Sequence, residues 1–286
     1  MLAAVGQLCS TNDVAHNARL CTDIIRRAAA AQAKIIYLPE AADFIASPEE
    51  VPKLAQPLEG GLFVEAIKKE ARESSIWVGV AVHEKGPKGS EDKCYNTQLL
   101  ISPQGEIAEA YRKLHLFNVN EDGREMSESK TTLSGDKLGD VVETPIGKVG
   151  MLTCYDLRFP EPALMLRRKG AQVLAYPAAW TSRAGPAHWD VLLRARAIET
   201  QSYILAPGQV GEPAPGRECW GHAMIVSPWG DVIACAPDRQ PRHPPDEKEQ
   251  EIGQFVVAEI ELEWLEKIRR EIPLWDQRRS DIYPIL

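Results

Sequence analysis

The chain has 286 residues, enough for one large domain with a sizeable apolar core, and 44% of them are hydrophobic. Its formal net charge of −8 argues against a nucleic-acid-binding protein, because that binding depends on a basic surface. No apolar stretch approaches the roughly 20 residues that a membrane-spanning helix needs, so no membrane partner is expected.

The first half of the chain alternates strand-like and helical patterns. Residues 2–8 form an apolar run that predicts a strand rather than a signal peptide. A helical stripe follows from Val14 to Ala28, with Thr11 or Asn12 as its expected cap. The next expected elements are a buried strand (34–39), a helix (63–71) and two strands (76–82 and 107–111).

The second half repeats this alternation. The apolar run 147–154 predicts a strand, and Glu161-Pro162 predicts the start of a helix that Gly170 can close. Residues 188–200 have the pattern of an amphipathic helix. Residues 239–251 are rich in proline and charge and predict a surface loop, and the aromatic tail at 272–286 is expected to dock on its own body or on a partner.

A weak internal repeat relates the two halves. Residues 33–42 resemble residues 171–180, and the hairpin pattern at 101–107 resembles the one at 226–232. Two similar sheets, each with helices on one face, would pack as one α-β-β-α sandwich, a four-layer α/β fold in a single domain over 1–286. Chance similarity between short apolar strands is the alternative.

The cysteines and histidines indicate neither a disulfide scaffold nor a metal site. No C-x-x-C or H-x-x-x-H spacing occurs among them. We therefore expect reduced thiols, no cofactor and a cytoplasmic location, while a mitochondrial form made from a longer product stays open.

Cys154 ends an apolar run and stands at the start of a predicted helix. A buried, inert thiol is the ordinary interpretation of such a residue. A reactive thiol is the alternative, because the dipole of the following helix would lower its pKa. The sequence alone leaves both open.

Two more predicted strands end on residues that could do chemistry. Glu40 is either a solvated loop carboxylate or a general base whose pKa is raised by its apolar neighbours. Lys113 is either a salt-bridge partner or the donor to an oxyanion. A thiol, a carboxylate and an ammonium group together suit attack on an amide, but their spacing does not show that they meet.

The segments around these residues resemble the three signatures of the nitrilase, or carbon–nitrogen hydrolase, superfamily. They are Leu38–Glu40, Tyr111–Phe117 and Thr153–Glu161, and they occur in the order found in that family. The resemblance continues through residues 185–199, 220–230 and 273–279. It implies the α-β-β-α sandwich, and a homodimer formed through helices and the tail.

The same resemblance implies roles for individual residues. Cys154 would be the nucleophile, Glu40 the general base and Lys113 the oxyanion stabiliser. The backbone N–H of Tyr155 would be a second oxyanion donor, and Glu128 would position the substrate and Lys113.

Within the superfamily, four segments most resemble the deaminated glutathione amidases, which release 2-oxoglutarate and cysteinylglycine. These segments are 38–46, which includes Phe44, and 185–189, 206–211 and 273–279. Arg158 is either a contact for a substrate carboxylate or a structural partner of Asp156 or Glu161.

Two positions depart from the family pattern near the expected pocket. Trp180 stands where the family usually has phenylalanine, and Ala184 where threonine is frequent. The predicted substrate-binding residues are therefore Tyr155, Arg158, Trp180, Phe44 and Ala184. An ω-amidase acting on 2-oxoglutaramate, a nitrilase, a thiol redox sensor and a catalytically silent binding protein are the alternative functions.

Overall fold

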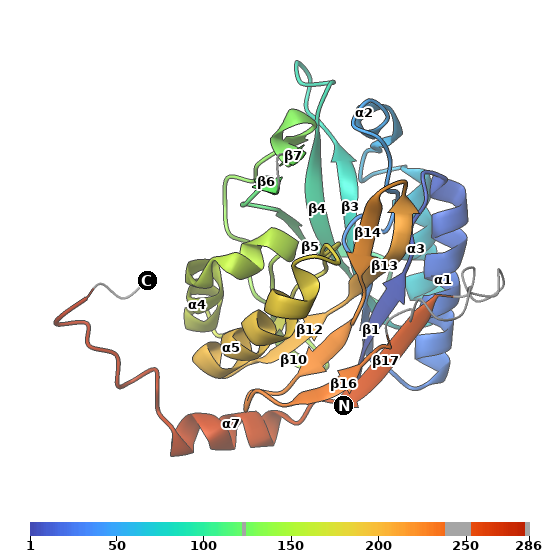
Figure 1. The fold of residues 1–286 in the computed structure, drawn as a ribbon. Coiled ribbons are helices and arrows are strands. Elements are labelled where there is room, and N and C mark those ends of the chain that lie inside the picture. The colour runs from blue at the N-terminus through green and yellow to red at the C-terminus, as the bar shows by residue number, and fades with distance from the viewer. Residues whose placement is uncertain (122–123, 238–252, 284–286) are drawn as a thin grey trace.

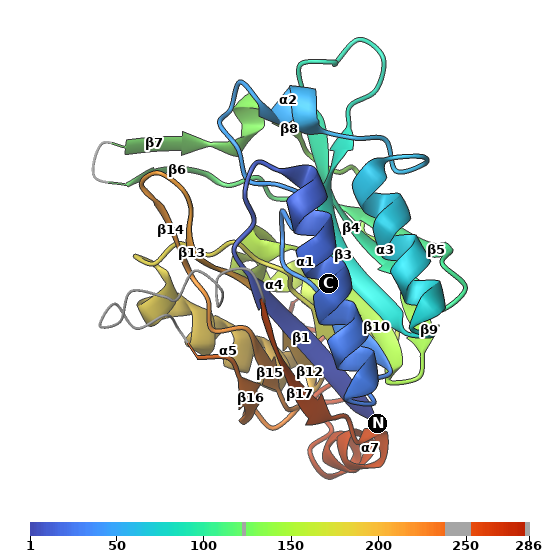
Figure 2. The same ribbon diagram turned by 90° about the vertical axis from the view of Figure 1, so that its right-hand side faces the viewer.

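Two β-sheets lie face to face at the centre of the molecule, and helices cover the outer face of each (Figures 1 and 2). The computed structural model describes residues 1–121, 124–237 and 253–283. The predicted surface loop at 239–251 and the last three residues of the predicted tail lie outside these ranges.

The first sheet contains parallel inner strands and antiparallel strands toward its edges. Its main path has the order β14-β13-β1-β2-β3-β4-β5; in addition, β17 pairs with β1 and β8 pairs with β4. The strands are β1 (Leu2–Leu8), β2 (Ile35–Tyr37), β3 (Trp77–Lys85), β4 (Cys94–Ile101), β5 (Ile107–Arg112), β8 (Thr132–Leu133), β13 (Gly208–Ala214), β14 (Arg217–Trp220) and β17 (Gln254–Glu259).

The second sheet has the order β16-β15-β12-β11-β10-β9, with β10, β11 and β12 parallel. Its strands are β9 (Val142–Thr144), β10 (Gly147–Met151), β11 (Val173–Ala175), β12 (Tyr203–Ala206), β15 (Met224–Val226) and β16 (Val232–Cys235). A separate hairpin joins β6 (Asn118–Glu121) to β7 (Arg124–Ser127).

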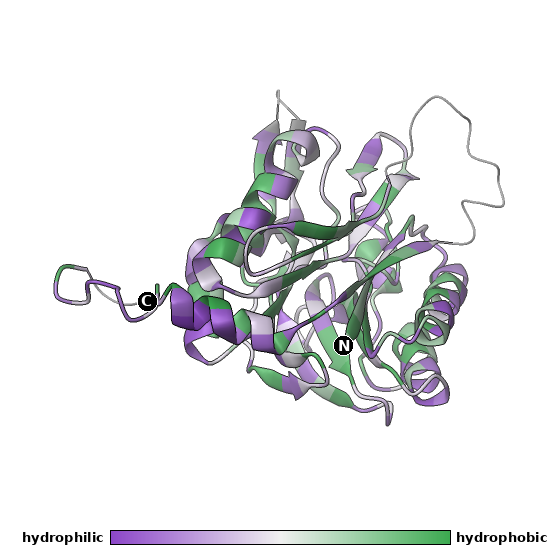
Figure 3. Ribbon diagram, turned by 90° about the horizontal axis from the view of Figure 1, so that it is seen from below, coloured by the Kyte–Doolittle hydropathy of each residue, from purple (hydrophilic) through white to green (hydrophobic). Residues whose placement is uncertain are grey.

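Helices α1 (Val14–Ala30) and α3 (Leu62–Glu73) lie side by side over the first sheet, as Figure 2 shows. Helices α4 (Pro160–Arg168) and α5 (Asp190–Thr200) lie on the other side of the molecule, against the second sheet (Figure 1). A short helix, α2 (Val51–Leu54), stands near one end of the molecule. Helix α7 (Leu262–Glu271) precedes the tail, which runs away from the body (Figures 1 and 3).

Side-chain alternation along the strands produces the layers. In β1, Ala3 and Val5 belong to the core cluster that also holds Val149 and Val173 of the second sheet. Ala4 points the other way, into a cluster with Ile24 of α1. Successive side chains of a strand point to opposite faces, so one apolar run supplies both layers. Figure 3 shows the apolar strands between the helical layers.

The four-layer sandwich expected from the internal repeat is confirmed. Strands β2 and β11, which carry the repeated segments, each follow a helix and lie among the parallel strands of their own sheet. The two predicted hairpins are β4–β5 and β15–β16.

Two local expectations need correction. Asp13, rather than Thr11 or Asn12, caps α1: its carboxylate accepts hydrogen bonds from the N–H groups of Ala15 and His16, both at 2.9 Å. The hydroxyl oxygen of Thr11 instead accepts a hydrogen bond from the N–H of Asp13, the capping residue itself. The helix expected to begin at residue 188 is α5, which begins at Asp190, because Gly185–Trp189 form a π-helix before it.

Candidate active site

The three reactive residues predicted from the sequence each follow a strand. Glu40 comes after β2, Lys113 directly after β5, and Cys154 opens a 3₁₀-helix, η2 (Cys154–Arg158), after β10. The first two strands belong to one sheet and the third to the other. The structure therefore brings the three side chains together between the sheets, where all are buried.

Glu40 and Lys113 form a buried ion pair. Glu40 Oε1 accepts hydrogen bonds from Lys113 Nζ at 2.9 Å and from Asn96 Nδ2 at 2.8 Å. Its other oxygen accepts the backbone N–H of Ala179 at 2.9 Å. Glu40 and Lys113 are only 5% and 2% exposed, so water screens this pair weakly.

Glu128 holds Lys113 from the other side. It opens a 3₁₀-helix, η1 (Glu128–Lys130), and its two carboxylate oxygens lie 2.9 and 3.2 Å from Lys113 Nζ. The N–H of Phe117 donates to Glu128 Oε2 at 2.7 Å and fixes its orientation. The ammonium group is thus held between two carboxylates.

Cys154 adopts a left-handed backbone conformation with φ of 46°, which is uncommon for a residue that carries a side chain. Its N–H donates to the carbonyl of Pro177 at 3.0 Å. The charges of Glu40 and Lys113 both act on its thiol, so the sulfur lies close to the buried ion pair. The turn at the strand end therefore directs the sulfur at the candidate base.

The charges in this cluster determine which groups are ionised. Burial raises the pKa of the Cys154 thiol, and the negative charge of Glu40 raises it further, so Lys113 only partly offsets the increase. The pKa of the thiol is thus raised, which is opposite to the direction expected from the following helix alone.

The pKa of Glu40 also moves opposite to the expectation. Burial alone would raise it, but Lys113 and the hydrogen bonds from Cys154 and Asn96 together hold it below its ordinary value. Burial would lower the pKa of Lys113, yet Glu128 and Glu40 raise it well above the usual range. The resting site contains a carboxylate, an ammonium group and a neutral thiol.

Asp156 joins the Cys154 segment to the Lys113 segment. It is fully buried, and its oxygens accept hydrogen bonds from the Tyr111 hydroxyl at 2.7 Å, the Thr153 N–H at 2.9 Å and the His115 N–H at 3.0 Å. His115 Nδ1 lies 2.7 Å from the same carboxylate. Asp156 thus caps η2 and anchors the chain just after Lys113.

Two of these supporting residues were not identified as site residues from the sequence. Asp156 stands three residues after Thr153, the spacing of a capping box, which is a signal that could have identified it. Asn96 is a buried polar residue within a strand, a weaker signal because many such residues serve only the sheet.

Arg158 lies among aromatic rings. Its guanidinium carbon is 5.0 Å from the centroid of Trp180 and 5.7 Å from that of Tyr155. Its Nη2 is 3.3 Å from His188 Nδ1. Among the described residues it forms no ion pair with Asp156 or Glu161, the two structural partners considered from the sequence.

The remaining predicted substrate-binding residues occupy different surroundings. Trp180 is 6% exposed, packs 5.3 Å from Trp189 between ring centroids, and its indole N–H has no acceptor within the described part of the chain. Ala184 is partly buried and leads into the π-helix. Phe44 is fully buried and stacks on His83 at 4.2 Å. Contact of any of these with substrate stays a prediction.

Within 1–121, 124–237 and 253–283, no three histidine, cysteine, aspartate or glutamate side chains gather as ligands for a metal ion. No helix in the same ranges is long and apolar enough to cross a membrane.

Comparison with known proteins places this arrangement in a family. The model of the carbon-nitrogen hydrolase family matches residues 2–269. The chain is 42% identical to the deaminated glutathione amidase of Homo sapiens, covering 99% of this chain and 83% of that protein. It is 41% identical to a probable hydrolase, nit2, of Schizosaccharomyces pombe, covering 100% of this chain and 99% of that protein.

A solved structure agrees with these matches. The fold superposes with a TM-score of 0.82 on Saccharomyces cerevisiae Nit3, a member of the nitrilase superfamily. The two are 30% identical, and the match covers 98% of this chain and 96% of Nit3. The chain matches a family model and curated relatives over nearly its whole length, and it gathers a cysteine, a glutamate and a lysine between two sheets. The chain belongs to the carbon-nitrogen hydrolase family.

Proposed function

We propose that this hydrolase cleaves the amide bond of deaminated glutathione and releases 2-oxoglutarate and cysteinylglycine. The observation that carries the chemistry is the buried ion pair of Glu40 with Lys113 at 2.9 Å, beside which the buried Cys154 lies. The substrate is inferred from relatives about 41% identical over nearly the whole chain that bear the name deaminated glutathione amidase.

The first half of the reaction forms an acyl-enzyme. Glu40 accepts the thiol proton as Sγ attacks the amide carbon, which moves the negative charge from Glu40 to sulfur without changing the total charge. The carbonyl oxygen becomes an oxyanion that accepts hydrogen bonds from Lys113 Nζ and the Tyr155 N–H. The C–N bond then breaks, and the proton on Glu40 passes to the amine of cysteinylglycine.

The second half releases the acid. Water enters where the amine left, and Glu40 takes one of its protons as the oxygen attacks the thioester carbon. The C–S bond breaks, and the proton returns to the thiolate while 2-oxoglutarate departs. Glu128 keeps Lys113 ionised and directed at the oxyanion throughout, which is consistent with its 2.9 Å contact.

Arg158 and Trp180 would bind the 2-oxo acid end of the substrate. A guanidinium group can hold a carboxylate by two parallel hydrogen bonds. The indole N–H of Trp180 is a buried donor without an acceptor among the described residues, and a substrate oxygen would satisfy it. Tyr155, Ala184 and Phe44 would shape the same pocket.

A substrate panel tests the proposal. Deaminated glutathione, 2-oxoglutaramate and a simple nitrile are assayed with the wild type and with Cys154→Ala, and adducts on Cys154 are sought by mass spectrometry. We expect the highest kcat/KM for deaminated glutathione, a trapped acyl adduct of the wild type, and no turnover by the variant. A higher kcat/KM for 2-oxoglutaramate would make the protein an ω-amidase, and an active Cys154→Ala protein would overturn the mechanism.

We further propose one domain over residues 1–286, a homodimer and a cytoplasmic location. Exposed apolar side chains on α4 and α5 support a dimer: Met165, Val191 and Ile198 are 44%, 62% and 47% exposed. Free thiols at Cys21, Cys94, Cys154 and Cys219 are typical of a reducing compartment. Sedimentation of the purified protein and its localisation in intact cells test the last two proposals.

A further inference from the structure

Asn96 of β4 contacts three of the residues to which the reaction is assigned. It is 6% exposed, and its carbonyl accepts the backbone N–H of Lys113 at 2.9 Å. Its side-chain nitrogen, Nδ2, donates to Glu40 Oε1 at 2.8 Å and to Glu128 Oε1 at 3.2 Å. A single neutral residue thus holds both carboxylates and the strand end that carries the lysine.

These contacts close a ring of four hydrogen bonds. Lys113 Nζ donates to Glu40 Oε1 at 2.9 Å and to Glu128 Oε1 at 3.2 Å. Asn96 Nδ2 donates to these same two oxygens. Two neighbouring carboxylates repel each other, and the amide group supplies two donors between them without adding a charge.

The two carboxylates fix the orientation of the Asn96 amide. The reverse orientation would bring Oδ1 against two negatively charged oxygens. In the observed orientation Oδ1 is buried and has no hydrogen-bond partner within the described part of the chain. A buried acceptor without a partner lowers stability, so the amide is oriented for Glu40 and Glu128 and against its own oxygen.

The two oxygens of Glu40 differ in what they can still accept. A carboxylate oxygen has two lone pairs, and Lys113 and Asn96 use both of those on Oε1. Oε2 accepts the N–H of Ala179 at 2.9 Å and has no second N–H or O–H donor among the described residues. Burial and Glu40 raise the pKa of the Cys154 thiol, whereas the Ala179 N–H acts to lower it, so the sulfur lies near the group that binds Oε2.

We propose that Asn96 is a positioning residue for the general base, Glu40. Together with Lys113 it fills Oε1, so that Oε2 is the oxygen that takes the proton of the thiol. In this step the S–H bond breaks, an O–H bond forms at Oε2, and the negative charge passes from the carboxylate to sulfur. Lys113 can then direct its donors to the oxyanion while Asn96 still holds the side chain of Glu40. The inference rests on the proposed function, in which Glu40 is the base.

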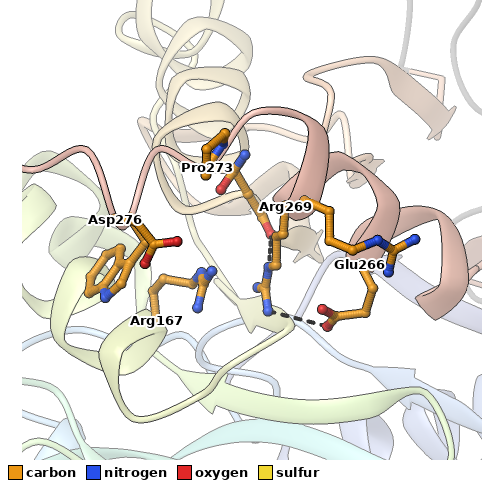
Figure 4. Close-up of a pocket in the computed structure, with 8 residues that line it drawn as sticks. Arg167, Glu266, Arg269, Pro273 and Asp276 are labelled. Carbon is orange, nitrogen blue, oxygen red and sulfur yellow. Dashed lines mark hydrogen bonds and ion pairs between the residues drawn. The ribbon is translucent and has the colours of Figure 1, made fainter.

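The pH dependence of turnover reports this role. Glu40 must be ionised to accept the proton, so the acid limb of the kcat/KM profile follows its pKa in the free enzyme. The titratable groups that face it are Lys113, Glu128, Cys154 and Cys219. Burial raises the pKa of Cys219 to about 12, so this thiol stays neutral there. The hollow between α4 and α7 in Figure 4 is lined by other residues, among them Arg167 and Glu266.

Asn96→Leu keeps the approximate shape of the side chain and removes both donors. The pH profiles of kcat and kcat/KM are measured on the amide of the substrate panel that the wild type cleaves best. A donor to the ionised carboxylate lowers its pKa, so we expect the acid limb to move up by about one pH unit. On the plateau kcat should fall by up to about 10²-fold, because the base is displaced, while KM changes less.

Asn96→Asp is the second variant. It keeps the shape more closely and adds a third carboxylate beside Lys113, so it should move the acid limb at least as far. An acid limb at the wild-type pH in the folded variants would overturn the proposal. Full activity of Glu40→Gln would instead refute the base itself, so failure of the inference and failure of the proposed function are distinguished.

Asn17→Leu is the matched control. Asn17 is also a buried amide, and its Nδ2 donates to the carbonyls of Thr11 and Asp43 at 2.8 and 2.9 Å. Its replacement should lower Tm but leave the acid limb unchanged. The same limb shift in Asn17→Leu and Asn96→Leu would mean that any loss of a buried amide produces it, and would contradict the proposal.

A neutron structure of the wild type tests the choice of oxygen without any variant. Crystals exchanged into deuterium oxide at a pH below the acid limb contain Glu40 in its protonated form. We expect deuterium on Oε2. Deuterium on Oε1 would overturn the proposal, whatever the variants show.

Discussion

Two neighbouring charges set the protonation of the candidate nucleophile. Glu40 raises the pKa of the Cys154 thiol and Lys113 lowers it, while burial acts in the same direction as Glu40. The same lysine holds the pKa of Glu40 below its ordinary value in spite of burial. Replacing Glu40 or Lys113 should therefore shift the pKa values of the remaining members of the cluster in a direction that follows from the charge removed.

Glu40→Gln should separate thiol ionisation from turnover. Loss of the carboxylate removes a negative charge beside the sulfur, so the pKa of the thiol should fall and alkylation by iodoacetamide should extend to lower pH. Turnover should nevertheless drop by a factor of about 10² to 10⁴, because no group remains to move the proton. Glu49→Gln, at an exposed position of the same segment, is the control. Unchanged kcat in Glu40→Gln would refute the assignment of the base.

Lys113→Met should reverse the pH dependence of stability that arises from Glu40. In the wild type the pKa of Glu40 is lowered, so its contribution is present above about pH 4.5 and is lost as pH falls through the folded-state pKa. Without the lysine, burial raises that pKa. Glu40 then contributes at low pH, and the contribution is lost as pH rises.

Urea unfolding at pH 5 and pH 7 measures this effect. Breaking a buried pair costs about 3–5 kcal/mol, so Lys113→Met should be strongly destabilised at pH 7 and less so at pH 5. Lys130→Met removes an exposed partner of Glu125 and should cost about 0–1 kcal/mol at both pH values. Equal destabilisation of Lys113→Met at both pH values would contradict the prediction.

At the scale of elements, the short helix η2 depends on the buried carboxylate of Asp156. This residue closes the capping box with Thr153 and also receives the Tyr111 hydroxyl at 2.7 Å. Tyr111 lies in β5, the strand that presents Lys113, so a single side chain fixes the relative positions of two site segments that come from different sheets.

Asp156→Asn should impair both stability and turnover. The amide presents one acceptor oxygen in place of two, and its NH₂ group would face buried donors, so we expect a loss of about 1–3 kcal/mol. kcat should fall more than KM rises, because η2 carries Cys154. Tyr111→Phe removes one hydrogen bond and should have a smaller effect, and Asp136→Asn at an exposed position should have none. A variant that is destabilised but has wild-type kcat would show that Asp156 only supports the fold.

At the scale of the whole molecule, the outer face of α4 and α5 is the place where the proposed dimer would form. The turn at Trp229, which is 55% exposed, packs next to α5, since Arg194 Nε donates to the Gly230 carbonyl at 2.7 Å. The tail leads away from the body past α7, and its residue Ile282 is 70% exposed (Figure 1). These exposed apolar side chains support this face as the proposed interface.

Ile198→Asp should convert the dimer into a monomer. A charge at the centre of an apolar contact would have to be desolvated without a partner, so association should weaken by several orders of magnitude. Val257→Asp introduces the same charge on β17, in the other sheet, and should leave the dimer intact. Sedimentation velocity distinguishes the two. A wild type that sediments as a monomer, or an Ile198→Asp protein that stays dimeric, would refute this interface.

Local patterns predicted many of the elements and drew attention to the candidate residues, whereas β6, β7, β13, β14 and β17 were not predicted. A continuous apolar run indicated β1, helical spacing of apolar residues indicated α1, and turn residues between apolar runs indicated both hairpins, because such patterns reflect burial and chain reversal. The abrupt change from apolar to polar residues around Glu40, Lys113 and Cys154 indicated that these strand ends carry side chains able to take part in a reaction. The cap of α1 was misplaced by one or two residues, since several neighbouring polar side chains could each accept the same hydrogen bonds.

Only the tertiary structure decided how these residues act on one another. Glu40 and Lys113 are separated by 73 positions along the chain yet lie 2.9 Å apart, and Cys154 reaches them from the second sheet. From sequence, the apolar neighbours of Glu40 suggested a raised pKa and the helix after Cys154 a lowered one. In the structure the pKa of Glu40 is lowered and that of Cys154 is raised. Electrostatic interaction depends on distance in space and on burial, and the order of residues along the chain contains neither of these two quantities.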